Sequence, residues 1–90
     1  MERYRVILKR SAAREIESID PKKTRQQIVR RIERLATEPR PPGCEKLSGK
    51  FSRYRIRQGP YRILYEIVDE DLYVYIVKVG HRREVYRDAT

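Results

Sequence analysis

The stretch FSRYRIRQGPYRILYE, residues 51–66, decides the fold. Apolar and polar residues alternate on both sides of a Gln58-Gly59-Pro60 turn, which is typical of two antiparallel strands joined as a hairpin. Successive side chains of a strand point to opposite faces, so Tyr54 and Ile56 share one face. The arginines gather on the other face: Arg53, Arg55, Arg57 and Arg62. A hairpin with one apolar face requires a second layer to cover it.

Upstream of the hairpin, the sequence predicts one strand and a short helix. Residues 4–9 alternate in the manner of a strand, with Tyr4, Val6 and Leu8 on one side. Ser11 is expected to cap a helix over residues 11–19. Its apolar residues recur at helical spacing: Ala12, Ile16 and Ile19.

A second helix is predicted from Asp20, as a capping carboxylate, and Pro21, at the first helical position. It should end before Pro39, because proline restricts the residue that precedes it. Its apolar stripe comprises Ile28, Val29, Ile32, Leu35 and Ala36. Residues 39–45 read as a loop, and a last strand, residues 72–79, follows a turn at residues 69–71.

These elements predict a single domain, residues 1–90, with the order β-α-α-β-β-β. We expect a two-layer α+β fold, in which two N-terminal helices pack on one face of a mostly antiparallel sheet. The covered face takes Tyr54, Ile56, Tyr61, Ile63, Tyr65 and Ile67. The open face is left with Arg53, Arg55, Arg57, Arg62, Leu64 and Glu66.

The charge of the chain indicates an anionic partner. Its 90 residues include 22 Lys and Arg against 13 Asp and Glu, for a net charge of +9. Such a field favours polyanions, of which nucleic acid is the commonest, although an acidic protein partner is the alternative. The single cysteine, Cys44, cannot form an internal disulfide, and no stretch approaches a membrane span. We therefore expect a cytoplasmic protein without a membrane partner.

The second half of the chain resembles the RelE-type toxins of type II toxin–antitoxin systems, within the RelE/ParE superfamily. The resemblance rests on a run of motifs: Leu47-Ser48-Gly49 before the basic strand, then Tyr61-Arg62 with Tyr65, then Val79-Gly80-His81-Arg82 and Tyr86. It extends over nearly the whole chain, although the helical half matches in layout more than in sequence.

The resemblance implies a ribosome-dependent endoribonuclease that cuts mRNA in the ribosomal A site and is neutralised by a cognate antitoxin. The ribose 2′-hydroxyl would attack its own phosphate, leaving a 2′,3′-cyclic phosphate and a 5′-hydroxyl. Neither a metal nor a small-molecule cofactor is implied. The expected partners are the ribosome, mRNA and the antitoxin.

The resemblance also implies roles for individual residues. Arg62 and Arg82 match cations that stabilise the phosphate, and Tyr86 matches a tyrosine that stacks on or orients the nucleotide. Arg55 and Arg57 stand where well-known relatives carry lysines that act as base and charge stabiliser. Further contacts to RNA are expected from Lys50, Arg53 and Arg83, although Arg53 also reads as a solvated edge residue.

The two arginines leave the general base unassigned, because arginine effectively cannot lose its proton. His81 is the sole histidine, and an unperturbed histidine titrates near neutrality. We hypothesise that crowding by Arg57, Arg82 and Arg83 favours its neutral form and that His81 serves as base or as acid. The alternative is a turn residue that contacts RNA or nothing, and Glu84 is a weaker candidate.

Two other functions remain open at this point. A ParE-like member would share the fold and inhibit DNA gyrase without nuclease chemistry, although members of that branch generally lack a basic strand together with a late tyrosine. A non-catalytic RNA-binding domain would need charge alone.

Overall fold

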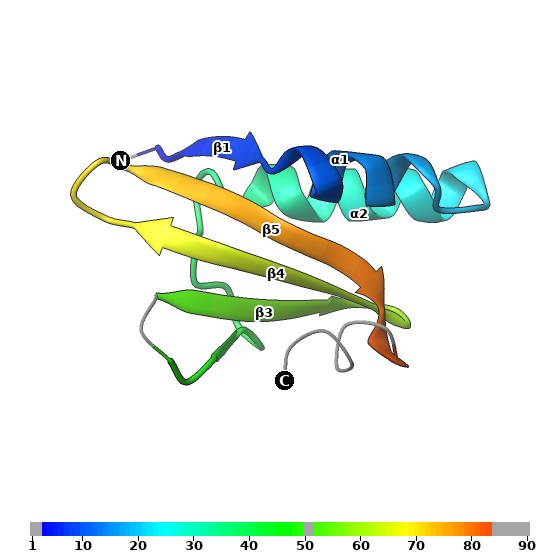
Figure 1. The fold of residues 1–90 in the computed structure, drawn as a ribbon. Helices are drawn as coiled ribbons and strands as arrows, with labels where there is room; N and C mark the ends of the chain where they lie inside the picture. The colour runs from blue at the N-terminus through cyan, green and yellow to red at the C-terminus, as the bar shows by residue number, and fades with distance from the viewer. Residues whose placement is uncertain (1–2, 50–51, 84–90) are drawn as a thin grey trace.

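In the computed structural model, which describes residues 3–49 and 52–83, two helices lie on one side of a five-stranded sheet (Figure 1). The elements are β1 (Arg5–Leu8), α1 (Arg10–Glu17), α2 (Lys22–Arg34), β2 (Glu45–Lys46), β3 (Arg53–Gln58), β4 (Tyr61–Val68) and β5 (Tyr73–His81). The predicted α+β class is confirmed. The structure adds one strand, β2, at the end of the stretch that was assigned to a loop.

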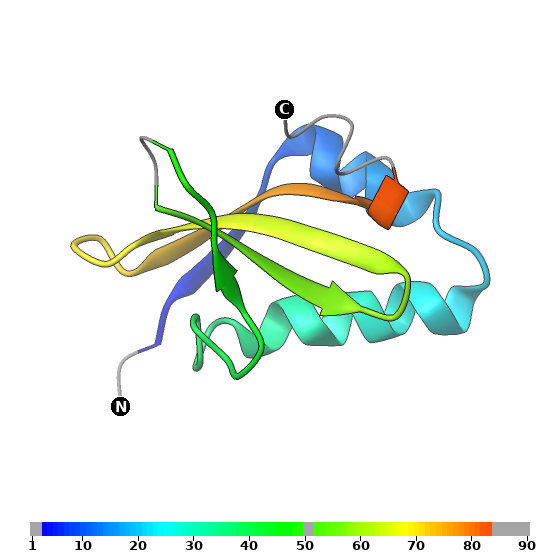
Figure 2. The same ribbon diagram turned by 90° about the horizontal axis from the view of Figure 1, so that it is seen from below.

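The strand order across the sheet is β1-β5-β4-β3-β2. β1 pairs with β5 in parallel, whereas the other three pairings are antiparallel. The two strands farthest apart in sequence, β1 and β5, are therefore neighbours. Figure 2 shows the strands fanned out from one another, as the right-handed twist of strands dictates. β2 forms the edge beside the basic strand β3.

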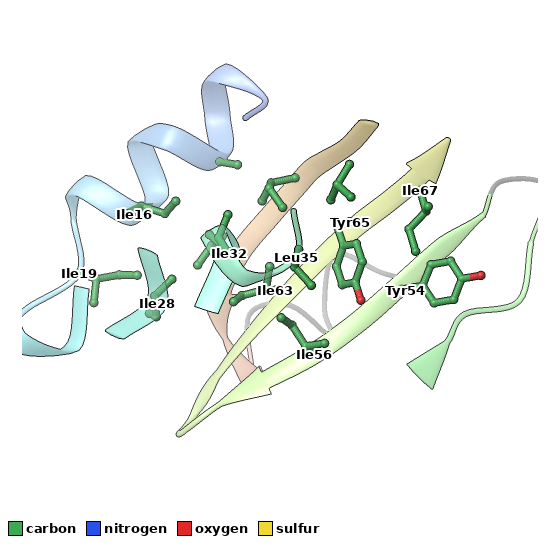
Figure 3. Close-up of a cluster of buried hydrophobic side chains, with 14 residues drawn as sticks. Ile16, Ile19, Ile28, Ile32, Leu35, Tyr54, Ile56, Ile63, Tyr65 and Ile67 are labelled. Atoms are coloured by element: carbon green, nitrogen blue, oxygen red, sulfur yellow. The ribbon is translucent and has the colours of Figure 1, made fainter. Parts of the chain in front are cut away.

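The core lies between the helices and the sheet. Figure 3 shows side chains of α1 and α2 pointing toward those of β3 and β4. The buried cluster includes the expected helix residues and the expected strand residues: Ala12, Ile16, Ile19, Ile28, Ile32, Leu35, Tyr54, Ile56, Ile63, Tyr65 and Ile67, with Val74, Ile76 and Val79 from β5. Each large aliphatic side chain here contributes about 1.5–3 kcal/mol on burial. Two-residue periodicity thus located the covered face correctly.

The helix starts differ from the prediction. α1 begins at Arg10 with Lys9 in the capping position, and α2 begins at Lys22 with Pro21 in that position. Neither Ser11 nor Asp20 caps its helix, and neither start has a side-chain capping bond. The contact with the sheet explains the start of α1. The Lys9 N–H donates to the Ile76 carbonyl of β5 (3.0 Å), so Lys9 is held at the end of the sheet and the helix begins at the next residue.

Val29, which was expected in the apolar stripe of α2, is exposed, and so is Leu8 of β1. Val29 of α2 is 38 % exposed and Leu8 of β1 is 44 % exposed. Val29 follows the buried Ile28 on the helix surface and lies at the margin of the apolar stripe. Leu8 ends an edge strand that has only one neighbour, so no second strand covers it. Within residues 3–49 and 52–83, no helix is long and apolar enough to cross a membrane.

Glu15 of α1 completes the edge of β5 beyond the end of β1. Its Oε1 accepts a hydrogen bond from the Val79 N–H (3.0 Å), and its Oε2 accepts one from Lys78 Nζ (2.9 Å). β1 pairs with β5 only as far as Ile76, so the Val79 amide has no strand partner on that side. A buried amide without a partner would cost about 1–3 kcal/mol. The carboxylate therefore anchors α1 to the C-terminal end of β5.

Hydrogen bonds from Arg40 and Tyr4 connect the β4–β5 turn to the rest of the fold. The Arg40 guanidinium donates to both oxygens of Asp69, at 3.3 and 2.9 Å, and Tyr4 Oη donates to Asp69 Oδ1 at 2.7 Å. These hydrogen bonds, first from Arg40 and then from Tyr4, lower the pKa of Asp69. Arg40 Nε also donates to Tyr54 Oη (3.1 Å). The network joins the loop before β2 to the sheet.

Candidate phosphate-binding face

The arginines of β3 lie on one face of the sheet, as the alternation predicted. Arg57 is paired with Arg62 of β4 in the antiparallel register, Arg55 with Leu64, and Arg53 with Glu66. Directly paired residues project to the same face, so two cations stand side by side near the β3–β4 turn. Gly80 of β5 is the next residue across from Arg62 and brings no side chain to this face. We call the face defined by Arg55, Arg57 and Arg62 the arginine face.

Arg62 is buried, which corrects the expectation that it would stand open to solvent. It is 7 % exposed, and Leu64 on the same face is also 7 % exposed. Alternation determines the direction of a side chain but not what surrounds it. Arg62 Nη1 donates to the carbonyls of Gly59 (3.1 Å) and Tyr61 (3.0 Å), which hold the guanidinium beside the turn.

The guanidinium of Arg62 retains capacity to bind an anion. Among residues 3–49 and 52–83, it forms no ion pair with a carboxylate, and its buried Nε has no hydrogen-bond partner. Burying a cation without a counter-charge is costly, by several kcal/mol. An incoming anion would offset that cost, so the buried cation is preorganised for a negatively charged ligand.

Arg55 and Arg57 share one carboxylate, Glu45 of β2. Glu45 is paired with Arg55 in the strand register, and its Oε2 accepts a hydrogen bond from Arg55 Nη2. Glu45 Oε1 lies 3.5 Å from Arg57 Nη2. The side chain of Arg55 is 14 % exposed, whereas those of Arg57 and Glu45 are 59 % and 49 % exposed. Arg57 and Glu45 thus form the accessible part of the face.

The other predicted RNA contacts differ in position. Arg53 forms an ion pair with Glu66 (3.0 Å) farther along the strands, so its charge is already balanced. Arg82 and Arg83 are exposed just beyond β5. The Arg82 N–H donates to the Pro60 carbonyl at 2.9 Å, which places this residue beside the β3–β4 turn and near the base of the arginine face.

His81 points to the other side of the sheet from Arg57 and Arg62. It is paired with Tyr61, and the two rings meet edge to face with centroids 6.0 Å apart. Arg62 instead pairs with Gly80, the preceding residue, so His81 and Arg62 project to opposite faces. Crowding by Arg57, which was expected, is therefore not a feature of this register. The His81 Nδ1 accepts a hydrogen bond from the Arg83 N–H (3.4 Å).

His81 lines a polar cleft of about 210 Å³ on the helix side of the sheet. The lining residues come from the end of α1 and the adjoining ends of β4 and β5: Glu15, Ser18, Ile19, Tyr61, Val79, Gly80 and His81. The cleft opens at the same end of β4 as the turn that holds Arg62. His81 is thus close to the arginine face in sequence, but separated from it by the sheet.

Three predicted residues, Lys50, Glu84 and Tyr86, lie outside the described residues. Sequence reasoning missed Glu45, which the structure brings against two of the predicted arginines. Its signal is weak, because a two-residue strand gives no visible alternation. No group of three or more His, Cys, Asp or Glu side chains that could hold a metal ion occurs within residues 3–49 and 52–83.

Comparison with known proteins adds a family context to this geometry. A model of the family described as the ParE toxin of the type II toxin–antitoxin system parDE matches residues 6–86. The toxin RelG of Mycobacterium tuberculosis is 33 % identical over 87 residues, which cover 93 % of this chain and 97 % of RelG. The mRNA interferase toxin RelE of Escherichia coli strain K12 is 33 % identical over 69 residues, which cover 72 % of each protein.

The fold also matches solved structures. The toxin in the archaeal RelE–RelB complex from Pyrococcus horikoshii superposes with a TM-score of 0.79 at 28 % identity, and the match covers 88 % of this chain and 94 % of that chain. The structural similarity therefore extends over most of the chain.

Proposed function

The chain belongs to the RelE/ParE superfamily of toxins from type II toxin–antitoxin systems, and from this premise we propose that it is a ribosome-dependent mRNA endoribonuclease. The similarity to an mRNA interferase supports the proposal, and so does the positive charge gathered on β3 and β4. The proposed reaction is metal-independent attack of a ribose 2′-hydroxyl on the adjacent phosphate.

The observation that carries the proposal is the buried cation of Arg62 beside Arg57. In-line attack produces a phosphorane with additional negative charge on its non-bridging oxygens. Preorganised donors aimed at developing charge are often the largest contribution to catalysis. A guanidinium fork matches two phosphate oxygens, and among residues 3–49 and 52–83 that of Arg62 has no carboxylate partner.

The remaining cations would hold the RNA around that phosphate. We assign charge stabilisation to Arg55 and Arg57 on the strand and to Arg82 beside the turn. Arg53 and Arg83 would contact neighbouring phosphates, together with Lys50. Tyr86, by its resemblance to family members, would stack on or orient the nucleotide. Surface arginines contribute to RNA affinity mainly through phosphate neutralisation, so binding should weaken as salt rises.

His81 is proposed as the acid that protonates the leaving 5′-oxygen, or as the base. Because His81 and Arg62 project to opposite faces of the sheet, either role would require the RNA to pass around the strand ends at the β3–β4 turn. An imidazole suits this step, because it can both donate and accept a proton.

We also propose that a cognate antitoxin silences the chain. The support is twofold: the archaeal RelE of similar fold was crystallised with RelB, and the net charge of +9 favours an acidic partner segment. Such a segment could neutralise the arginine face directly.

Inhibition of DNA gyrase is the second candidate function, because the matching family model is named for ParE toxins. That function would not require the phosphate-binding role proposed for Arg62. The balance of the observations therefore favours the nuclease.

The test is induced expression of the chain without an antitoxin, followed by mapping of mRNA ends and DNA breaks. The nuclease proposal predicts growth arrest with cuts inside translated reading frames, spaced in phase with codons. Gyrase-linked DNA breaks with intact mRNA would support the second candidate instead. Growth without arrest would leave only a non-catalytic RNA-binding domain.

A further inference from the structure

We propose that Glu45 is the general base that takes the proton from the attacking 2′-hydroxyl. The assignment rests on the proposed function and deepens it, because Glu45 is a carboxylate that the described part of the chain brings against two arginines of the face. Glu45 belongs to β2, the one strand that the sequence pattern did not indicate, and it reaches the arginine face through the pairing of β2 with β3.

The contacts place the Glu45 carboxylate where a substrate phosphate would bind. One oxygen accepts from Arg55 Nη2, and the other lies 3.5 Å from Arg57 Nη2. Carboxylate and phosphate are recognised by the same guanidinium donors. The side chain of Glu45 is 49 % exposed, so its carboxylate faces the solvent side from which RNA would arrive. A phosphate that engages Arg57 would therefore lie within one side-chain length of this carboxylate.

Among residues 3–49 and 52–83, the other groups considered near the face are poor proton acceptors for this step. Arg55, Arg57 and Arg62 remain protonated under all physiological conditions. His81 projects to the opposite side of the sheet. Glu66 shares the arginine side of the sheet, but it is paired with Arg53 and separated from the Arg57–Arg62 pair by the Arg55–Leu64 pair. Glu45 is thus the described carboxylate that touches the cations of the face.

The proposed step balances as a proton transfer coupled to phosphoryl transfer. When the phosphate binds Arg57 and Arg62, the Glu45 carboxylate exchanges its contact with Arg57 for one with the 2′-hydroxyl. The hydroxyl proton moves to the carboxylate while the 2′-oxygen forms a bond to phosphorus. The bond from phosphorus to the 5′-oxygen breaks, and that oxygen takes a proton from His81 or from water. Glu45 then returns its proton to solvent.

A different role for the same contact is an electrostatic gate. If Glu45 only neutralises Arg55 and Arg57, it competes with RNA, and its removal should strengthen RNA binding and leave cleavage as fast or faster. A base and a gate therefore predict opposite changes in the cleavage rate when the carboxylate becomes an amide.

The test compares the wild type with Glu45→Gln, Glu45→Asp and the matched control Glu66→Gln. Glu66→Gln removes one negative charge from the same side of the sheet at the Arg53 pair. Purified protein is mixed with ribosomes that carry mRNA and a vacant A site, and the single-turnover cleavage rate is measured from pH 5 to 9. Ribosome affinity and the thermal unfolding midpoint are measured for each variant.

General acid–base catalysis by one residue typically contributes about 100- to 10,000-fold, so Glu45→Gln should slow cleavage at least about 100-fold. Its ribosome affinity should be unchanged or higher, its rate should lose the decline toward acidic pH, and Glu45→Asp should retain part of the rate. The control should stay within about fivefold, since the Arg53–Glu66 pair is separated from the Arg57–Arg62 pair by the Arg55–Leu64 pair.

Two results would overturn the assignment of Glu45 while leaving the proposed function intact. The first is an active wild type with an equally active Glu45→Gln variant. The second is a loss of cleavage in Glu45→Gln that only follows its loss of ribosome affinity or of folding, with Glu45→Asp equally impaired. A wild type that cleaves nothing on ribosomes would instead overturn the proposed function itself.

Discussion

Replacing Arg62 with methionine should separate stability from activity. The change removes a guanidinium that is 7 % exposed, and it keeps an unbranched apolar side chain in its place. Two hydrogen bonds to the Gly59 and Tyr61 carbonyls are lost. Each such bond contributes about 0.5–1.5 kcal/mol net, or somewhat more from a charged donor, and water can replace the guanidinium at the exposed Gly59.

The substitution also removes the cost of desolvating the cation in the folded state, which amounts to several kcal/mol when no counter-charge is present. This gain offsets the lost hydrogen bonds. We therefore expect the free energy of unfolding of Arg62→Met to equal that of the wild type or to exceed it by about 1–2 kcal/mol. Cleavage should fall about 100- to 1,000-fold, the loss typical of removing one preorganised donor to developing charge.

The assay for stability is urea unfolding, followed by far-ultraviolet circular dichroism and by tyrosine fluorescence, since the chain has seven tyrosines and no tryptophan. Single-turnover cleavage on ribosomes gives the activity. A variant destabilised by more than about 2 kcal/mol would show that Arg62 holds the fold together, as a buried structural residue does. Unchanged cleavage would show that the buried cation does not meet the phosphate.

Three further predictions follow from the same contacts. His81→Gln should slow cleavage and flatten its pH profile near neutrality; an unchanged rate and profile would remove His81 from the chemistry. Asp69→Asn should remove a part of the free energy of unfolding that depends on pH. The pKa of the Asp69 carboxyl is lowered in the folded state, so the carboxylate stabilises the fold above its unfolded pKa, near 3.8, and this contribution is lost as pH falls through the folded pKa. Urea midpoints from pH 2 to 6 test this, and parallel curves for variant and wild type would contradict it. Ile63→Ala, at a side chain with no exposed area, should lower the free energy of unfolding by about 2–5 kcal/mol, and a loss below about 1 kcal/mol would place Ile63 outside the core.

The strands were predictable from sequence where they are long and pair with near neighbours. Residues 61–68 were predicted as a strand, and β4 runs from Tyr61 to Val68. The alternation there spans eight residues, and the adjoining turn contains Gly59 with a φ of +59°, a conformation that glycine adopts without strain. β2 was missed because two residues show no alternation, and its pairing with β3 depends on the path of the preceding loop.

The sequence predicted the directions in which the side chains of the candidate site point, but not how deeply they are buried. Alternation correctly placed Arg57 and Arg62 on one face, since the period of a strand is a local property. The burial of Arg62 depends on what surrounds that face, which no local pattern records. The contact of Glu45 with Arg55 and Arg57 likewise requires the register between two strands, and only the folded chain determines that register.

We propose that this chain cuts mRNA in the ribosomal A site by transesterification. The most direct measurement incubates the purified chain with mRNA, free or held on ribosomes with a vacant A site, and then determines the chemistry of the new RNA ends. We expect cuts only on ribosomes, with 2′,3′-cyclic phosphate and 5′-hydroxyl ends, and little cutting by Arg62→Met. Intact mRNA on ribosomes exposed to the correctly folded wild-type chain would contradict it.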